Sequence, residues 1–439
     1  MAVKAERSNP LRPYRNTMRL EAYIEDMEPD EEARRRRLAE EKSYEILDHV
    51  DAAEDRFSEA LSGEALVGST SPSIFVGRSD YPAVSTGILS PVGEEDRAAE
   101  FATSGAWYAR GLDIEDVLGY RTGLLNADRS AHAAVGGTWS GFLGVQREVA
   151  IADRPVDVEI GLAETPEMDF SADGVGTPTG PRARAESASL GENPHVPRQV
   201  KKTLEDDDWR AQGAMTYLYR RGFDVYEIDD VLSAGALGRR ENRRLVPTRW
   251  SITAVDDTVG QFLRGRIRNA REIDETQVWA NEYMGNRYWV VLTPGSWEFE
   301  LVEMKRPGSI WNQDPGGETW MASAHEGYSG RTGYVEETAG AYYAARLGVL
   351  EHLADVDRQA KALVLREVSD DYWAPVGVWQ VRESVRNAFE GTPGVAETFH
   401  GAVREVSGKL PVSLAALRRK SHLVSGLQTG LTEFTGTDT

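Results

Sequence analysis

The alternation of apolar and polar positions predicts a chain that mixes strands with helices. Apolar or β-branched runs predict strands at 71–78, 251–255 and 364–367, and 287–304 has the pattern of a hairpin that turns at Pro294 and Gly295. Helical periodicity predicts helices at about 96–120, 197–209, 209–237, 336–355, 377–390 and 395–408. Strands that alternate with helices in this way indicate an α/β (mixed α+β) fold with one large mixed core.

Shifts in composition along the chain suggest four regions. Residues 27–63 are strongly charged, with four consecutive arginines at 34–37 among acidic neighbours, which is typical of a solvated helix. Residues 164–194 are rich in Gly, Pro, Ser and Thr and predict a long loop. We expect an N-terminal helical segment over 1–65, two main regions over 66–250 and 251–420, and a disordered tail over 421–439.

Length and composition exclude several classes of protein. The 439-residue chain has no Cys, so disulfides, thiolate zinc sites and cysteine nucleophiles are excluded. No apolar stretch is long enough to span a bilayer, and the N-terminus lacks the apolar region of a signal peptide. We therefore expect a cytoplasmic protein without a membrane partner.

The charge balance is that of a protein adapted to high salt. The net charge is −21, and the 50 basic residues comprise 8 Lys and 42 Arg. This acidic, lysine-poor composition resembles that of proteins from halophilic archaea. Because the Debye length falls to about 3 Å at molar salt, the negative charge neither favours nor excludes nucleic acid as a partner.

The C-terminal tail carries a pattern with which peptides dock on a DNA sliding clamp. A Gln, an aliphatic residue and an aromatic residue follow each other at intervals of three, within the segment Gln428, Thr429, Gly430, Leu431, Thr432, Glu433, Phe434 and Thr435. One helical turn places Leu431 and Phe434 on the same side, while the Gln428 amide can form hydrogen bonds beside the groove. Burial of the two apolar side chains contributes roughly 3–6 kcal/mol, against an ordering cost of about 2–5 kcal/mol. The alternative is a frayed tail with two incidental apolar residues.

Six arginines are candidates for binding phosphate. They are Arg78, which follows an apolar strand, and the Arg-rich block with Arg239, Arg240, Arg243, Arg244 and Arg249. The first four of the block would share one face if their segment is helical, and guanidinium groups suit phosphate geometry. The alternatives are ion pairs with the many carboxylates of the chain and, for Arg78, an exposed turn.

A Glu-x-Lys sequence on a predicted strand raises a second hypothesis, a Mg²⁺-dependent nuclease. Glu303 and Lys305 would share one face of the strand, and Asp256 or Asp257 could supply a further carboxylate. The alternative is an amphipathic strand with charged outer positions. The seven histidines show no metal-ligand spacing and no nucleotide-binding loop is present, so we expect no metal site and no cofactor.

Several segments together resemble one family, the archaeal Nre DNA repair proteins of the NreA type. The segments are Ser71-Pro72-Ser73-Ile74-Phe75-Val76-Gly77-Arg78 with Tyr81-Pro82, then 196–203, 245–257, 339–347 and 377–383. The resemblance implies a role in DNA damage repair, with Gln428, Leu431 and Phe434 engaging the sliding clamp (PCNA). Thr435 stands where the full motif has a second aromatic residue. Many relatives carry a four-cysteine zinc element, which this chain lacks because it has no Cys.

Overall fold

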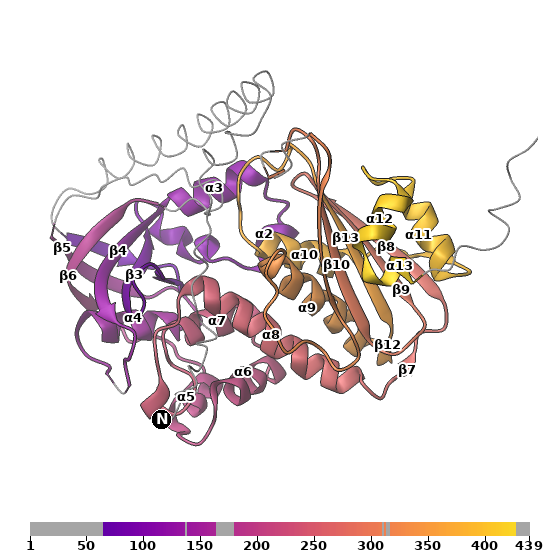
Figure 1. Ribbon diagram of the computed structural model, residues 1–439. Helices are drawn as coiled ribbons and strands as arrows, with labels where there is room; N and C mark the ends of the chain where they lie inside the picture. The colour runs from indigo at the N-terminus through magenta and orange to yellow at the C-terminus, as the bar shows by residue number, and fades with distance from the viewer. Residues whose placement is uncertain (1–64, 137, 164–179, 310, 313–316, 427–439) are drawn as a thin grey trace, which may run out of the picture.

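The computed structural model describes residues 65–136, 138–163, 180–309, 311–312 and 317–426. Two six-stranded mixed sheets lie at opposite sides of the molecule, with layers of helices between and around them (Figure 1). This arrangement confirms the predicted mixed α/β class. The predicted N-terminal helical segment, up to residue 64, and the tail from residue 427 lie outside the described residues. Within the described part, no helix has the length and apolar character that crossing a membrane requires.

The first sheet is formed by the N-terminal half of the described chain. Its strands run in the order β1-β5-β6-β4-β3-β2, and only β4 and β6 are parallel neighbours. Their bounds are β1 Ala65–Ser69, β2 Ile74–Val76, β3 Ala83–Pro91, β4 Leu124–His132, β5 Asp157–Leu162 and β6 Arg182–Leu190. The predicted loop over 164–194 is therefore wrong for 182–190. The buried positions at the start of β6 are the small residues Ala183 and Ala185, which give a weak apolar signal.

The helices of the N-terminal half lie within the predicted helical segments, apart from 141–150, where no helix was predicted. They are η2 Glu95–Phe101, α2 Gly105–Ala109, α3 Ile114–Thr122, α4 Gly141–Ala150, α5 Arg198–Glu205, α6 Ala211–Arg220 and α7 Val225–Ser233. Capping boxes at Asp113 and Asp224 begin α3 and α7, because each side chain accepts a hydrogen bond from the first turn. Between α7 and the next long helix lies only the short η3 Arg240–Asn242.

The predicted strand over 251–255 is wrong, because these residues belong to the twenty-residue helix α8, Thr248–Ile267. The buried residues Ser251, Val255, Val259, Leu263 and Ile267 recur every fourth position, which is the period of a helix face. Packing along this face outweighs the β-branched content of the first turns. The predicted region boundary between 250 and 251 falls inside this helix.

The second sheet is formed by the C-terminal half and contains one further correction. Its order is β11-β10-β13-β9-β8-β14, with β8 Thr276–Tyr283, β9 Asn286–Thr293, β10 Glu298–Lys305, β11 Trp320–Glu326, β13 Lys361–Val368 and β14 Gly394–Ala396. The predicted strands at 287–304 are present, but they are not a hairpin. β13 lies between them, with Val364 opposite Val290 on β9 and Leu301 on β10. A separate pair joins β7 Arg271–Glu272 to β12 Arg358–Gln359.

Helices cover both faces of the second sheet and create two cores. α9 Ala339–Asp355 and α10 Trp379–Ala388 lie on the face toward the first sheet, whereas α11 Phe399–Ser407, α12 Leu414–Lys420 and α13 His422–Ser425 lie on the outer face (Figure 1). On β10, Phe299 and Leu301 join a large core that continues into the first sheet. Val302 and Met304 join a smaller core under α11 to α13. The odd and even positions of β10 therefore serve different layers.

Candidate functional site

Segments that carry the family resemblance meet at the N-terminal half of α8. The Val76 amide donates a hydrogen bond to Thr248 Oγ1 at 3.0 Å, so the end of β2 is fixed to the first turn of the helix. The rings of Tyr81 and Trp250 lie 5.2 Å apart. Ser251, one residue further, is 2.7 Å from Ser233 of α7 through their hydroxyl oxygens. α8 thus ties the first sheet to the helix layer.

A buried ion pair joins α8 to α10. Both oxygens of Asp256 accept hydrogen bonds from the Arg382 guanidinium, with Nη2 2.8 Å from each oxygen and Nε 3.1 Å from Oδ1. Each side chain is only 1% exposed. Burial alone would lower the pKa of Arg382, but Asp256 and the neighbouring Tyr226 raise it well above its usual value. The Tyr226 ring also lies 4.7 Å from the guanidinium, as in a cation–π contact.

Two further buried carboxyl groups lie on α7, of which Asp229 adjoins this pair and Asp230 faces Ser73 and Ile74. Burial raises the pKa of Asp229 well above its usual value, and its Oδ1 has no hydrogen-bond partner within the described residues. Burial also raises the pKa of Asp230 to about 7, although the Ser73 hydroxyl and the Ile74 amide donate to its oxygens at 3.2 and 3.4 Å. Burial therefore favours the uncharged form of Asp229.

A second ionic network continues along α10 toward the solvent. Arg386 donates to both oxygens of Glu351 on α9, at 2.7 and 2.8 Å, and to Glu383 at 2.9 Å. It also lies 3.3 Å from Asp224, the residue that caps α7. One guanidinium therefore connects α7, α9 and α10, and both networks hold the helix layer between the two sheets.

The structure does not bring the predicted nuclease residues into one site. Asp256 is buried against Arg382 on the α8–α10 contact, and Asp257 pairs with Arg346 of α9. Glu303 pairs instead with Arg366, its neighbour across the β10–β13 ladder. Glu303 and Lys305 do share one face of β10, as predicted. Each of these carboxylates already has a guanidinium partner. The three ion pairs join α8 to α10, α8 to α9 and β10 to β13, so they do not form one cluster.

Lys305 likewise has a local environment of its own. Its ammonium group lies 4.2 Å from the centre of the Trp320 ring on the neighbouring strand β11. Burial lowers the pKa of this lysine, an effect that the nearby Glu303 opposes. A lysine held against an aromatic face in this way stabilises the sheet edge, so its position needs no bound metal or water to explain it.

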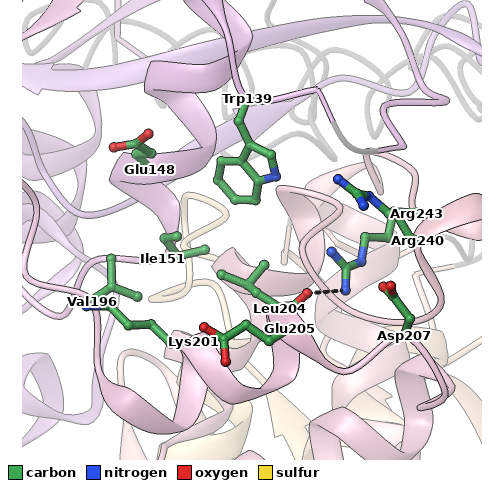
Figure 2. Close-up of a pocket in the computed structure, with 10 residues that line it drawn as sticks. All are labelled: Trp139, Glu148, Ile151, Val196, Lys201, Leu204, Glu205, Asp207, Arg240 and Arg243. Carbon is green, nitrogen blue, oxygen red and sulfur yellow. Dashed lines mark hydrogen bonds between the residues drawn. The ribbon is translucent and has the colours of Figure 1, made fainter.

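The Arg-rich block lies beside an open pocket of about 430 Å³ between α4 and α5 (Figure 2). The Arg147 guanidinium lies 4.0 Å from the Trp139 ring, so this wall of the pocket is held in place. Three basic residues face three acidic ones, and the rest of the lining is apolar. The lining comprises Trp139, Glu148, Ile151, Val196, Lys201, Leu204, Glu205, Asp207, Arg240 and Arg243. Its charges balance, unlike those of a dedicated phosphate site.

The condition for a common face of the Arg-rich block is not met, because only 240–242 is helical and that turn is a 3-10 helix. Arg243 is buried and donates to the carbonyl oxygens of Gly238 and Leu204, each at 2.9 Å. Its donors are thus used inside the protein. Arg239 donates to the Asp208 carbonyl at 3.5 Å.

The other candidate arginines lie at separate places. Arg240 lines the pocket, Arg244 forms a β-bridge with Ala134, Arg249 is exposed in the first turn of α8, and Arg78 is exposed just after β2. Phosphate binding by these exposed arginines stays a prediction. The predicted clamp-binding residues, Gln428 to Thr435, lie outside the described residues.

These features define an α/β protein with two mixed sheets, joined by helices whose buried ion pairs lie at the centre of the molecule. Residues 38–312 match the family described as Archaeal Nre, N-terminal, and residues 326–434 match Archaeal Nre, C-terminal. The chain belongs to the archaeal Nre family, and the resemblance carried by its sequence segments is confirmed.

Curated relatives cover most of the chain. A protein of Haloferax volcanii named DNA repair protein NreA is 64% identical over 420 residues, which are 95% of this chain and 100% of the relative. A protein of Archaeoglobus fulgidus named DNA repair protein NreA is 38% identical over 77% of this chain and 84% of its own length. A second protein of that organism, named DNA repair protein NreB, is 35% identical over 84% of this chain and 92% of its own length. No solved structure matches the chain.

Sequence reasoning missed the basic partners of the buried carboxylates. Arg382 lies within the resembling segment 377–383 and Arg346 within 339–347, yet neither stood out as a functional residue. One signal was present for Arg346, because a guanidinium inside an otherwise apolar helical segment requires a buried acid as partner. The identity of that acid depends on the tertiary fold.

Proposed function

We propose that this protein acts in DNA repair and is recruited to DNA by the sliding clamp (PCNA) through Gln428, Leu431 and Phe434. The observation that carries the repair role is the 64% identity, over the full length of the relative, to a protein named DNA repair protein NreA. At that level of identity and coverage, a change of cellular role between the two chains would be unusual. The proposal places the protein in the cytoplasm with the archaeal chromosome.

Two observations support the tail as the docking segment. The match to the C-terminal family region runs through Phe434 and therefore includes all three anchor positions of the motif. The last described helix, α13, ends at Ser425, and the motif begins three residues further along the chain. A segment placed this close to a helix packed on the sheet can reach a partner without opening the core.

The clamp contact is tested with the full chain and purified clamp by isothermal titration calorimetry. We expect saturable binding that Leu431→Ala with Phe434→Ala abolishes, because the two side chains supply the buried apolar surface. Thr432→Ala with Glu433→Ala lies on the same segment but off the apolar side, and serves as the matched control. Equal binding by both double variants would reject the tail as the docking site.

The repair role is tested separately in cells. A strain that lacks the gene should be more sensitive to DNA-damaging agents, and the intact chain should restore survival. The Leu431→Ala, Phe434→Ala variant should restore it incompletely if clamp recruitment is required. Full rescue by this variant would leave a repair role that does not depend on the clamp, whereas normal survival of the deletion strain would refute the repair role.

Direct contact with DNA is a further part of the proposal, and it rests on the exposed arginines near α8. Replacement of Arg240, Arg244 and Arg249 by Ser should weaken binding to duplex DNA and reduce the slope of affinity against salt by up to about three phosphate contacts. Fluorescence anisotropy at several KCl concentrations measures both. An unchanged slope would exclude these residues from the DNA contact.

The nuclease hypothesis receives no support from the geometry, because its residues do not converge.

A further inference from the structure

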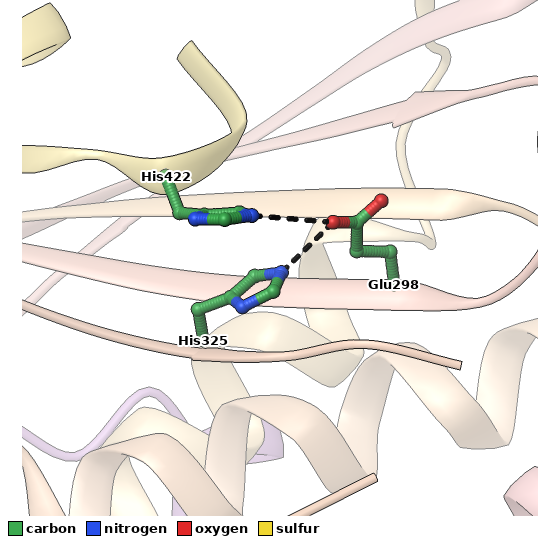
Figure 3. A group of neighbouring side chains, drawn as sticks. All are labelled: Glu298, His325 and His422. Atoms are coloured by element: carbon green, nitrogen blue, oxygen red, sulfur yellow. Dashed lines mark hydrogen bonds and ion pairs between the residues drawn. The ribbon is translucent and has the colours of Figure 1, made fainter. Parts of the chain in front are cut away.

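Two histidines and a glutamate from distant parts of the sequence converge on the outer face of the second sheet. Glu298 begins β10, His325 lies on the adjacent edge strand β11, and His422 is the first residue of α13. His325 Nε2 lies 2.9 Å from Glu298 Oε1, and His422 Nε2 lies 3.9 Å from the same oxygen. Figure 3 shows both imidazoles directing a ring nitrogen at this one carboxylate oxygen.

We propose that Glu298, His325 and His422 bind a divalent transition-metal ion of the Zn²⁺ type. The three potential ligand atoms all lie within 4.8 Å of one another. Tetrahedral Zn²⁺ with bonds near 2.0–2.1 Å holds its ligand atoms about 3.4 Å apart. The two measured separations, 2.9 and 3.9 Å, lie on either side of that value. Small side-chain rotations are therefore enough to complete the site.

The chemistry of the donors selects the class of ion. Two imidazole nitrogens and one carboxylate oxygen suit Zn²⁺ and its neighbours in the first transition series, whereas Mg²⁺ and Ca²⁺ prefer oxygen ligands alone. The His422 side chain is 64% exposed, so the fourth position faces solvent and can hold water or an exchangeable ligand. Lys361 lies 2.9 Å from Glu298 Oε2, the other oxygen, which leaves Oε1 to the metal.

The backbone of His422 is fixed independently of its side chain. Glu300, which is fully buried on the same face of β10, accepts hydrogen bonds from the amides of His422 and Leu423 at 2.7 and 2.9 Å. The Ser421 hydroxyl donates to it at 2.7 Å. His325 lies directly opposite Glu300 in the β10–β11 ladder. Hydrogen bonds therefore fix the backbone of β11 and of α13 to β10, so the three ligand residues are held near one another before an ion binds, as a preorganised site requires.

A bound ion would link α13 to β10 and β11. The rings of His325 and His422 already lie 4.0 Å apart between their centres, so the ion would add bonds to both rings where the structure shows a contact between them. This link lies just before the segment that we assign to clamp binding. Metal binding would therefore hold α13, which precedes that segment, on the sheet. The metal site itself does not depend on whether the clamp is the partner.

The test is a titration of the metal-free full chain with Co²⁺ and Zn²⁺ in molar KCl, which screens weak binding to the net charge of −21. We expect one tight site per chain and a visible Co²⁺ spectrum. Glu298→Gln, His325→Ala and His422→Ala should each weaken binding by about tenfold or more. His195→Ala is the matched control, because His195 is an exposed imidazole beside one carboxylate, Asp153, at 2.8 Å.

A gain-of-signal variant keeps the test independent of lost stability. Because the chain has no Cys, His422→Cys would introduce its single thiol, and a Co²⁺–thiolate charge-transfer band would appear only if this position ligates the ion. Zn²⁺ should also slow hydrogen exchange in residues 421–425. The proposal is overturned if no site saturates, if His422→Ala binds as tightly as His195→Ala, or if His422→Cys shows no thiolate band. The cluster would then be a hydrogen-bonded ion pair without a metal.

Discussion

The Asp256–Arg382 pair offers a direct test of what the helix layer contributes to stability. Arg382→Met keeps most of the side-chain volume but removes the cation, which leaves Asp256, at 1% exposure, without its guanidinium partner. Breaking a buried pair from one side costs about 3–5 kcal/mol, because a buried charge is left uncompensated. Asp256→Asn should cost less, about 1–3 kcal/mol, since its amide oxygen still accepts hydrogen bonds from Arg382.

The double variant separates the pair from its surroundings. Asp256→Leu with Arg382→Met removes both charges of the pair, and burial, which raises the pKa of Asp229 well above its usual value, favours the uncharged form of this neighbour. We therefore expect the double variant to be more stable than Arg382→Met alone, with a coupling free energy of about 1–3 kcal/mol. Exchange of a whole buried pair for apolar residues is often neutral.

The pH dependence of Arg382→Met has a defined sign. Burial already raises the pKa of Asp256 above its usual value although Arg382 opposes the rise, and removal of the guanidinium raises this pKa further. The folded variant therefore binds more protons than the unfolded chain between the two pKa values. Stability is then retained at acidic pH and lost as the pH rises. We expect the deficit relative to the wild type to be larger at pH 8 than at pH 5.

The assay is urea unfolding in molar KCl, followed by tryptophan fluorescence and by far-UV circular dichroism, whose coincidence tests for two-state behaviour. The control is Arg287→Met, which breaks a surface pair with Glu282 whose side chains are 46% and 63% exposed. That change should cost less than about 1 kcal/mol. Equal midpoints for Arg382→Met and the control would refute the structural role of the pair. A stable Asp256→Asn protein that had lost a DNA-cleaving activity would instead revive the nuclease hypothesis.

Three further changes test other parts of the fold. Glu300→Gln should destabilise α13 by about 1–3 kcal/mol, because it weakens the three hydrogen bonds to this buried carboxylate, and faster hydrogen exchange over 421–425 would report the loss. Burial lowers the pKa of His352, and the opposing effect of Asp355 is smaller. The unfolded chain therefore binds a proton that the folded protein does not bind, so stability falls as the pH drops through about 6.5. His352→Phe should flatten this part of the melting temperature profile, and an unchanged profile would contradict the assignment. Gly235→Ala should cost about 1–3 kcal/mol, since φ is +65° and the new Cβ would lie 2.6 Å from a carbonyl oxygen, whereas Gly213→Ala on α6 meets nothing within 4 Å and should not destabilise.

Local patterns were sufficient for much of the secondary structure. The apolar periodicity of 336–355 predicted α9, and the apolar run at 364–367 predicted the centre of β13. Helix periodicity also located α10 and α11 to within a few residues. These elements obey rules that act over a few residues, namely the 3.6-residue helix period and the apolar content of a strand buried on both faces.

Where several local signals conflicted, only packing decided the outcome. The β-branched residues at 251–255 favour a strand, but a continuous buried face from Ser251 to Ile267 makes the segment a helix. The strands of 287–304 were recognised, yet their pairing was not, because β13 enters between them from more than fifty residues further along the chain. A tight turn between two strands predicts a hairpin only when no third strand takes the partner's place.

The sequence by itself determined the class of fold, the family and the position of the tail motif, because each is encoded in residues that are neighbours along the chain. Tertiary structure alone decided which charges meet. Asp256 and Arg382 are 126 residues apart, and His325 and His422 meet over Glu298 without any ligand spacing between them. Side-chain chemistry of this kind depends on distances of a few ångströms, and only the folded chain brings such distant residues that close.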